Sequence, residues 1–490
     1  MDGKMEENLN QGLLKFIQDS PSVFHVIDNM KRRLEEAGFV ECREQDCWEL
    51  QYGGAYYVTR NDSSLIAFRL PHACDLGDGR PFKGYHIVAA HSDSPTFKVK
   101  TSPETVAENQ YVRLNVEKYG GMILSTWLDR PLSVAGRVAV READGSLGMR
   151  LVNLDRDLLV IPNLAVHMNR EINSGYEYNP QVDMLPLMGL WEEKCEEQNS
   201  RFAFGEPGVQ ASLGMSKSHS APGGADVQVS RKTSKSRSVP GESGPQSPKG
   251  MLFWEIAQAL ELRPEDILDG DLYLYVREKG RVLGRDGELI LSPKLDDLQC
   301  VYAGVEGFVS STPNLYANVL AVFDNEEVGS GTRQGADSTF LEDVLLRIQD
   351  SLGYGPSVYR QLVAESFLIS ADNAHAVHPA HPGKADITNR PVLGGGIVIK
   401  YHGGQKYTSD AMSAARMKLW CEQAHVPCQT FANRSDMLGG STLGNISTSH
   451  VSLAAVDIGL PQLAMHSAVE TGSSRDTAYA VAAFEQFWQE

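Results

Sequence analysis

The 490-residue sequence predicts an α/β protein in which a mixed central sheet is flanked by helices and interrupted by a β-rich second domain. From residue 292 onward, short apolar runs alternate with helical patterns, as strands and helices do in an α/β layout. Between about residues 100 and 285, valine-rich runs alternate with turns, and little helical periodicity is visible. We therefore expect one discontinuous domain, 1–100 plus 286–490, and one inserted domain, 101–285.

Helices are expected at both ends of the chain. Apolar residues recur at helical spacing between residues 9 and 17. Ser20 and Pro21 then predict the N-cap and first-turn proline of a second helix, which Gly38 ends. A final helix is predicted from about residue 475 to residue 489.

Strands are predicted wherever short apolar runs are bounded by turn residues. In chain order these runs are 56–58, 65–70, 85–90, 134–140, 158–161, 315–323, 367–370, 396–399 and 461–465.

One low-complexity segment, residues 212–250, lies inside the expected second domain. It is rich in Ser, Gly, Pro, Lys and Arg and has no aromatic residue. Such a segment cannot bury enough apolar surface to offset the entropy lost on ordering, so we expect a mobile loop. Its basic residues could also attract a polyanion, but a solvated loop is the favoured interpretation on a chain this acidic.

Composition excludes several classes of protein. The net charge is −18, so the surface repels nucleic-acid phosphates and anionic lipid, and neither is expected as a partner. No run approaches the ~18 to 20 apolar residues of a spanning helix, and the polar N-terminus lacks a signal-peptide pattern. The cysteines form no Cys-x-x-Cys pair and are odd in number, which favours reduced thiols in a cytoplasmic protein. They are Cys42, Cys47, Cys74, Cys195, Cys300, Cys421 and Cys428.

Four predicted strands are each followed at once by a histidine or a carboxylate. In open α/β sheets, ligands bind at the carboxyl ends of strands, so we expect these side chains to share one edge. A fifth segment, Asp296-Asp297, precedes an apolar helical run. The four strand ends are His91-Ser92-Asp93, Asp324-Asn325-Glu326-Glu327, Asp372-Asn373-Ala374-His375 and His466-Ser467.

These side chains are suited to a pair of divalent cations. Imidazole and carboxylate ligands fit Zn²⁺, Co²⁺ or Mn²⁺, and two ions can share a bridging carboxylate and a water. Neighbouring side chains on a straight strand point oppositely, but in a turn at Gly329 one of Glu326 and Glu327 can bind metal while the other faces the water.

Each residue also has a simpler interpretation. A histidine at a strand end is usually solvated or capped, and paired glutamates are usually surface charge. Asp296 by itself is better explained as a helix N-cap. Glycines 394–396 and 439–440 are interpreted as tight turns rather than anion cradles. Motifs for zincins, serine hydrolases, phosphate loops and dinucleotide folds are absent from the sequence.

At these residues the sequence resembles the M18 metallopeptidases, the aspartyl aminopeptidases. The similarity runs in family order through most of the chain. Its segments are His91-Ser92-Asp93-Ser94-Pro95, residues 163–170, Leu295-Asp296-Asp297-Leu298, residues 324–330, residues 370–379 and Met465-His466-Ser467.

The resemblance implies a role for individual residues and for the inserted domain. His91 and Asp372 would hold one metal ion and Glu327 and His466 the other, with Asp296 bridging; Zn²⁺ is the favoured metal. Glu326 would be the general base and acid. His167 would reach into a neighbouring subunit and stabilise the oxyanion. The inserted region 101–285 would be a dimerisation domain, and the dimers would build a tetrahedral dodecamer.

The family typically removes an N-terminal Asp or Glu from peptides. An acidic side chain in a closed pocket needs a positive partner, for which Lys400 and His378 are the candidates. After His466 the sequence Ala468-Val469-Glu470 lacks the arginine of eukaryotic members, so a related aminopeptidase or deacylase of neutral or broad preference is an alternative. A further alternative is an assembled binding shell with a silent site.

Overall fold

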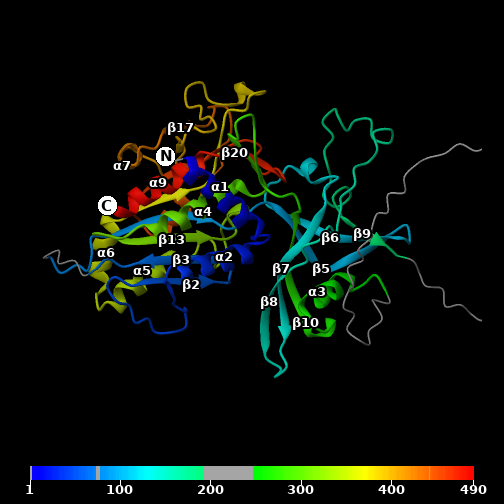
Figure 1. Ribbon diagram of the computed structural model, residues 1–490, viewed down its shortest axis with the longest axis horizontal. Coiled ribbons are helices and arrows are strands. Elements are labelled where there is room, and N and C mark those ends of the chain that lie inside the picture. The colour runs from blue at the N-terminus through cyan, green and yellow to red at the C-terminus, as the bar shows by residue number, and fades with distance from the viewer. Residues whose placement is uncertain (1–2, 73–77, 192–246, 441) are drawn as a thin grey trace, which may run out of the picture.

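The computed structural model describes residues 3–72, 78–191, 247–440 and 442–490. Residues 212–246 of the low-complexity segment, which was expected to be a mobile loop, lie outside the described residues. Over the described residues, strands from both halves of the chain form a nine-stranded mixed sheet in the order β1-β2-β3-β13-β4-β14-β18-β16-β17 (Figure 1). The strands are β1 (Val40–Glu41), β2 (Ala55–Arg60), β3 (Ser64–Arg69), β4 (Tyr85–His91), β13 (Ala317–Phe323), β14 (Phe367–Ala371), β16 (Ile397–Tyr401), β17 (Cys428–Ala432) and β18 (Ala454–Gly459).

The centre of this sheet is parallel: β13, β4, β14 and β18 run side by side in the same direction. The β2–β3 hairpin and the β16–β18 pair are antiparallel and make the sheet mixed, as predicted. A parallel strand pair needs a crossover connection, so helices must cover both faces.

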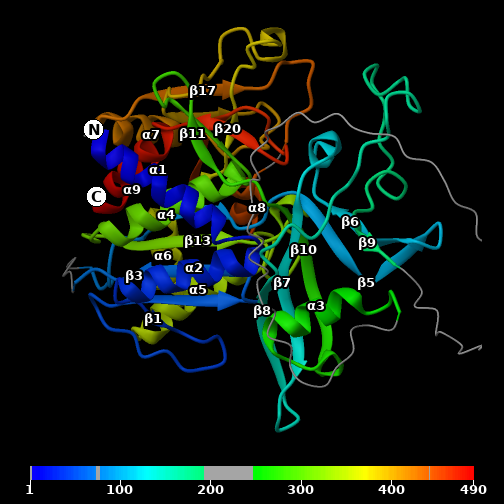
Figure 2. The ribbon, with the colours of Figure 1, turned by 45° about the vertical axis from the view of Figure 1, so that its right-hand side comes forward.

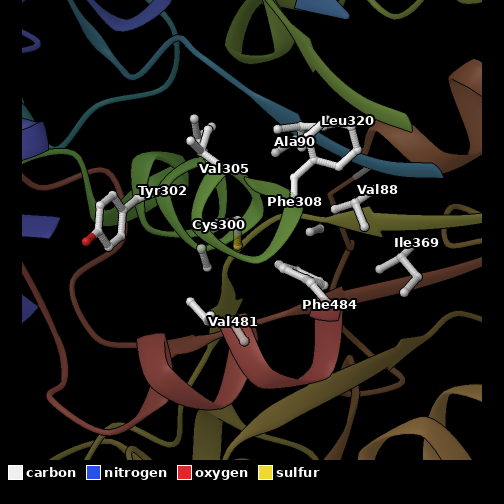
Figure 3. Close-up of a cluster of buried hydrophobic side chains, with 14 of the residues drawn as sticks. Val88, Ala90, Cys300, Tyr302, Val305, Phe308, Leu320, Ile369, Val481 and Phe484 are labelled. Carbon is white, nitrogen blue, oxygen red and sulfur yellow. The ribbon is translucent and has the colours of Figure 1, made fainter. Parts of the chain in front are cut away.

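Helices form a layer on each face of the sheet. Side chains alternate between the two faces, so Val88 and Ala90 of β4 enter one core while Ile87 and Ala89 enter the other. Figure 3 shows the first core, where Val305 and Phe308 lie close to strand residues. This core involves α1 (Gly3–Gln18), α2 (Val23–Glu36), α4 (Leu295–Ser310), α7 (Ala411–Gln423) and α9 (Asp476–Gln489). The opposite core involves α5 (Phe340–Ser351), α6 (Pro356–Glu365) and α8 (Leu443–His450).

A second sheet lies beside this assembly in both Figure 1 and Figure 2. Within the described residues it has six strands in the order β8-β7-β10-β5-β6-β9 and its own apolar core. Its elements are β5 (Thr96–Ala107), β6 (Tyr111–Tyr119), β7 (Leu132–Arg141), β8 (Leu147–Asn153), β9 (Leu187–Leu190), β10 (Ile267–Val276) and helix α3 (Met251–Leu260).

Short elements connect and close these layers. The strands are β11 (Arg281–Leu283), β12 (Leu289–Ser292), β15 (Ala374–His375), β19 (Pro461–Gln462) and β20 (Glu470–Ser473). The 3₁₀ turns are η1 (Leu124–Trp127), η2 (Pro264–Asp266), η3 (Glu326–Val328) and η4 (Pro382–Lys384). None of the described helices is both long and apolar enough to cross a membrane.

Three local predictions are wrong. Helix α2 has its N-cap at Ser22 rather than Ser20, because the chain is still extended at Ser22. Residues 158–161 form only isolated bridges. The predicted strand 461–465 is reduced to β19. The strand of the main sheet is instead β18, in which Asp457 interrupts the apolar run. That carboxylate is buried but accepts hydrogen bonds from Thr408 and Thr442.

Candidate metal centre

The parallel centre of the main sheet brings the predicted strand ends together. His91 is the last residue of β4, Asp372 follows β14, and Glu326 and Glu327 form η3 just after β13. Because these three strands are parallel neighbours, their carboxyl ends meet at one edge.

Two groups of ligand atoms lie at this edge. The first comprises His91, Asp296, Asp297 and Asp372, and the second comprises Asp296, Glu327 and His466. Within each group the ligand atoms all lie within 4.8 Å of one another. All five residues predicted to bind metal are therefore brought together, and Asp297, which was not predicted, joins the first group.

Asp296 belongs to both groups. Its Oδ1 lies 3.6 Å from Nε2 of His91, and its Oδ2 lies 3.4 Å from Nε2 of His466. The second group is completed by Glu327, whose Oε1 is 3.4 Å from the same His466 nitrogen. The two oxygens of one carboxylate thus face different imidazoles, which is the arrangement required of a bridging ligand.

Asp296 is not the N-cap that its position before a helix favoured. The N-cap of α4 is Lys294, whose side chain makes no capping hydrogen bond. The backbone at Asp296 and Asp297 is not helical, which turns the Asp296 carboxylate toward the histidines instead of the first turn.

The donor set fits bound cations. Asp296 Oδ1, Asp297 Oδ1 and Glu327 Oε1 are buried, and none of them has a hydrogen-bond partner among the described residues. A buried carboxylate oxygen is costly unless it is paired or coordinates a metal. Imidazole nitrogens and carboxylate oxygens are ligands that Zn²⁺, Co²⁺ and Mn²⁺ share.

The pKa shifts of these carboxyl groups reflect the same need for positive charge. Burial raises the pKa of Glu326 to about 8; the charge of His91 opposes this shift, and the carboxylate of Asp372 adds to it. Burial also raises the pKa of Glu327 well above its usual value, with Asp296 contributing repulsion. Burial acts in the same direction on Asp296, but the nearby imidazoles of His466 and His91 favour its ionised form and keep its pKa below the ordinary range.

The two histidines are held so that Nε2 points into the site. Nδ1 of His91 lies 3.0 Å from the carbonyl oxygen of Asp93, and Nδ1 of His466 lies 2.5 Å from that of Gly121. A hydrogen bond from one ring nitrogen to a carbonyl fixes the tautomer that leaves the other nitrogen free to bind metal.

Asp93 lies in a predicted strand end, but the sequence predicted no role of its own for it. Its two carboxylate oxygens accept the backbone N–H groups of Glu326 and Glu327, both at 3.1 Å. Its Oδ2 also accepts the hydroxyl of Tyr119 from the second sheet. The turn that carries both glutamates is therefore fixed by a residue two positions after His91.

A cavity of about 510 Å³ opens onto the metal centre. Its lining includes Glu326, Asp372 and Lys400, together with His375, for which the sequence predicted no role. Lys400 on β16 is 3% exposed, and its Nζ lies 3.4 Å from Oδ2 of Asp372. His378 also lines the cavity but is exposed, and its Nδ1 accepts the N–H of Ala380.

His167 is the predicted site residue that lies elsewhere. It is exposed on the loop between β8 and β9, and it is not among the described residues that line the cavity. In Figure 1 the teal part of this loop, at the upper right, extends away from the main sheet.

Comparison with known proteins places this geometry in a family. A family model described as aminopeptidase I zinc metalloprotease (M18) matches residues 16–488. The chain is 43% identical over 487 residues to a probable M18 family aminopeptidase 2 of Clostridium acetobutylicum, with 99% of both chains covered.

Solved structures show the same similarity. The cryo-EM structure of the Ape4 and Nbr1 complex matches with a TM-score of 0.84 and 33% identity, over 99% of this chain and 86% of that one. The S. cerevisiae mApe1 dodecamer matches with a TM-score of 0.77 over 99% of this chain and 97% of that one. Its 23% identity makes this last similarity one of fold alone.

Proposed function

The chain belongs to the M18 family of zinc metallo-aminopeptidases, and from that premise we propose that it removes the N-terminal residue of peptides at a site for two divalent cations. The observation that carries the proposal is the position of Asp296, with one oxygen toward His91 and the other toward His466. Under this proposal, one ion is held by His91, Asp372 and Asp296 and the other by Glu327, His466 and Asp296.

Such ions, when bound, supply a water of lowered pKa and polarise the carbonyl of the peptide bond to be cleaved. Glu326 then acts as the general base and acid: it takes a proton from the attacking water and returns it to the leaving amine. Its place in the cavity lining supports this role, and so do the hydrogen bonds of Asp93, which hold the turn while Glu327 faces His466.

Restriction to the N-terminal residue follows from the charge of the cavity. Asp296, Glu326 and Asp372 line its inner end and attract the protonated amino terminus of a peptide. An internal peptide bond has no such charge and gains nothing from that end of the cavity.

For the N-terminal side chain we propose a preference for Asp or Glu. Lys400 is buried in the cavity wall and supplies the positive charge, with His375 and His378 as further polar groups. One observation favours the neutral or broad alternative: Lys400 already lies 3.4 Å from Asp372, so part of its charge is engaged.

We further propose that the chain is cytoplasmic and self-associates through region 101–285 into a dodecamer. The loop around His167 supports association, because Leu164, Val166 and Met168 are 49%, 51% and 75% exposed. Large apolar side chains that cluster on a surface loop are typical of a protein interface. In an assembly this loop would bring His167 to the site of a neighbouring subunit.

A single experiment tests both the metal site and the specificity. Metal-free protein is loaded with Zn²⁺, Co²⁺ or Mn²⁺, its metal content is measured, and Asp-, Glu-, Leu- and Lys-anilides are offered. We expect two ions per chain and the highest kcat/KM for the Asp or Glu substrate. A preference for Leu-anilide would instead support the neutral alternative. Uptake of well under one ion per chain, with no hydrolysis, would support the silent shell.

A further inference from the structure

Behind the metal centre, a single buried carboxylate connects two segments that are far apart in sequence. Glu470, at the start of β20, is 2% exposed. Its Oε2 accepts the backbone N–H of Asp296 at 3.0 Å, and its Oε1 accepts the backbone N–H of His466 at 2.7 Å. Asp296 and His466, two of the proposed metal ligands, are thus both hydrogen-bonded to Glu470.

Glu470 is also part of a buried hydrogen-bond network formed by side-chain amides. Gln462 donates its Nε2–H to Glu470 Oε1 at 3.4 Å, and its own Oε1 accepts Nδ2–H of Asn373 at 2.8 Å. Asn373 follows Asp372 directly and also donates to the carbonyl of Leu295 at 2.9 Å. The segments that carry Asp296, Asp372 and His466 are therefore joined behind the ligands.

The chemistry of these contacts requires a carboxylate. Each partner of Glu470 just named is a donor, and an ionised carboxylate is the side chain that only accepts. An isosteric amide would direct its NH₂ group at one of the two backbone N–H groups and lose that bond.

His466 depends on this support more than the other ligands do. Its backbone has φ of 66°, in the left-handed region, which is strained for a residue other than glycine. Glu470 and the carbonyl of Gly121 hold it there. On the other side of the site, His91 is anchored on Asp93 and Asp372 is paired with Lys400.

We infer that Glu470 is a positioning residue. It holds His466 and Asp296 in the relative position needed to bind the second cation, the one shared with Glu327. This inference rests on the proposed two-metal function. Loss of Glu470 should weaken the ion at His466 selectively, because the ion at His91 has anchors of its own.

The test is metal binding to the Glu470→Gln variant. Metal-free protein is titrated with Zn²⁺ against a competing chelator, and Co²⁺ absorption spectra are recorded in parallel. We expect wild type and the exposed control Glu365→Gln to bind two ions. Glu470→Gln should keep one ion within about threefold of wild-type affinity and bind the second about 10- to 100-fold more weakly, the range seen when a ligand's hydrogen-bond partner is lost. The thermal midpoint of the metal-free variant should stay close to wild type.

The outcomes distinguish the proposed two-metal function from the inference about Glu470. If wild type takes up fewer than two ions, the proposed function fails. If wild type binds two and Glu470→Gln binds both equally well, or loses both equally, only the inference about Glu470 is overturned. Should Glu470→Gln not fold, Gln462→Met carries the test: a smaller loss confined to the second ion is expected, and unchanged affinity for both ions overturns the inference.

Discussion

At the scale of single residues, Glu326 and Glu327 show how two adjacent, identical side chains come to face different partners. They lie in a 3₁₀ turn between Asn325 and Gly329, which both have positive φ. The turn directs Glu327 toward His466 and leaves Glu326 in the wall of the cavity. A straight continuation of β13 would have placed them on opposite faces of the sheet.

Replacing Glu326 tests its role as base. Glu326→Gln keeps the shape but cannot take a proton, so kcat should fall by about 10²- to 10⁴-fold. Metal content should remain at the wild-type level, because Glu326 belongs to neither ligand group. The variant Glu342→Gln, at a half-buried position on α5 that does not line the cavity, serves as the matched control. Turnover of Glu326→Gln near that of the control would show that another group moves the proton.

The pH dependence of activity should report the protonation state of Glu326. Among the protein groups alone, burial raises the pKa of Glu326 to about 8. Nearby cations stabilise its carboxylate and lower that pKa. A base must be deprotonated to act, so kcat/KM should fall as pH drops, with a midpoint below pH 8. A rate profile of the Zn²⁺-loaded enzyme locates this midpoint; a midpoint above pH 8 would contradict the assignment.

Lys400 can be tested against a second lysine of the same cavity. Lys400→Met should lower kcat/KM for Asp-anilide at least about tenfold more than for Leu-anilide, because an acidic side chain would then be buried without a partner. Lys384 lines the outer part of the cavity, and Lys384→Met is the control. If the control loses the acidic preference instead, charge recognition lies at the entrance.

At the scale of elements, β4 connects the site to the rest of the fold. Its carboxyl end holds His91, and near its other end His86 stacks between Tyr316 and Phe487, with ring centroids 3.7 and 4.4 Å away. His86 also exchanges hydrogen bonds with α9: its Nδ1 is 2.9 Å from the carbonyl of Phe487, and its carbonyl accepts the indole N–H of Trp488.

This packing predicts a pH-dependent stability. Burial lowers the pKa of His86 from 6.5 to about 3. The unfolded chain therefore binds a proton first as pH falls, and stability is lost between about pH 6.5 and 3, by up to about 1.4 kcal/mol per pH unit. Thermal midpoints at pH 7.5 and pH 5 should drop less in His86→Phe than in wild type. An exposed-histidine variant, His425→Asn, should drop like wild type. Equal drops for His86→Phe and wild type would contradict the prediction.

At the scale of the whole molecule, an exposed apolar loop next to a second sheet is the feature that predicts assembly. Met168→Asp should weaken self-association by about 10- to 100-fold, since burial of a methionine contributes about 1.5–3 kcal/mol. Light scattering across a concentration series measures the change, and Met5→Gln on α1 is the control. If both variants assemble like wild type, the loop is not part of the interface.

The central strands of the main sheet could be predicted from the sequence because each corresponds to a local run of apolar residues. The apolar runs that became β4, β13 and β14 are continuous, since these strands are buried on both faces. A polar residue directly after such a run marks the strand end, which is why His91, Glu327 and Asp372 could be identified. β18 was missed because Asp457 interrupts its run, and its hydrogen-bond partners come from segments far away in the chain.

The sequence by itself determined the α/β class, the ends of the strands and the kinds of side chain that follow them, because periodicity and residue type are local properties. Only the tertiary structure decided that Asp296 faces two histidines rather than capping its helix, and that the carboxylates of Asp93 and Glu470 accept backbone N–H groups from the segments around these side chains. Those assignments depend on hydrogen bonds between segments up to 234 positions apart, and no local pattern encodes such contacts.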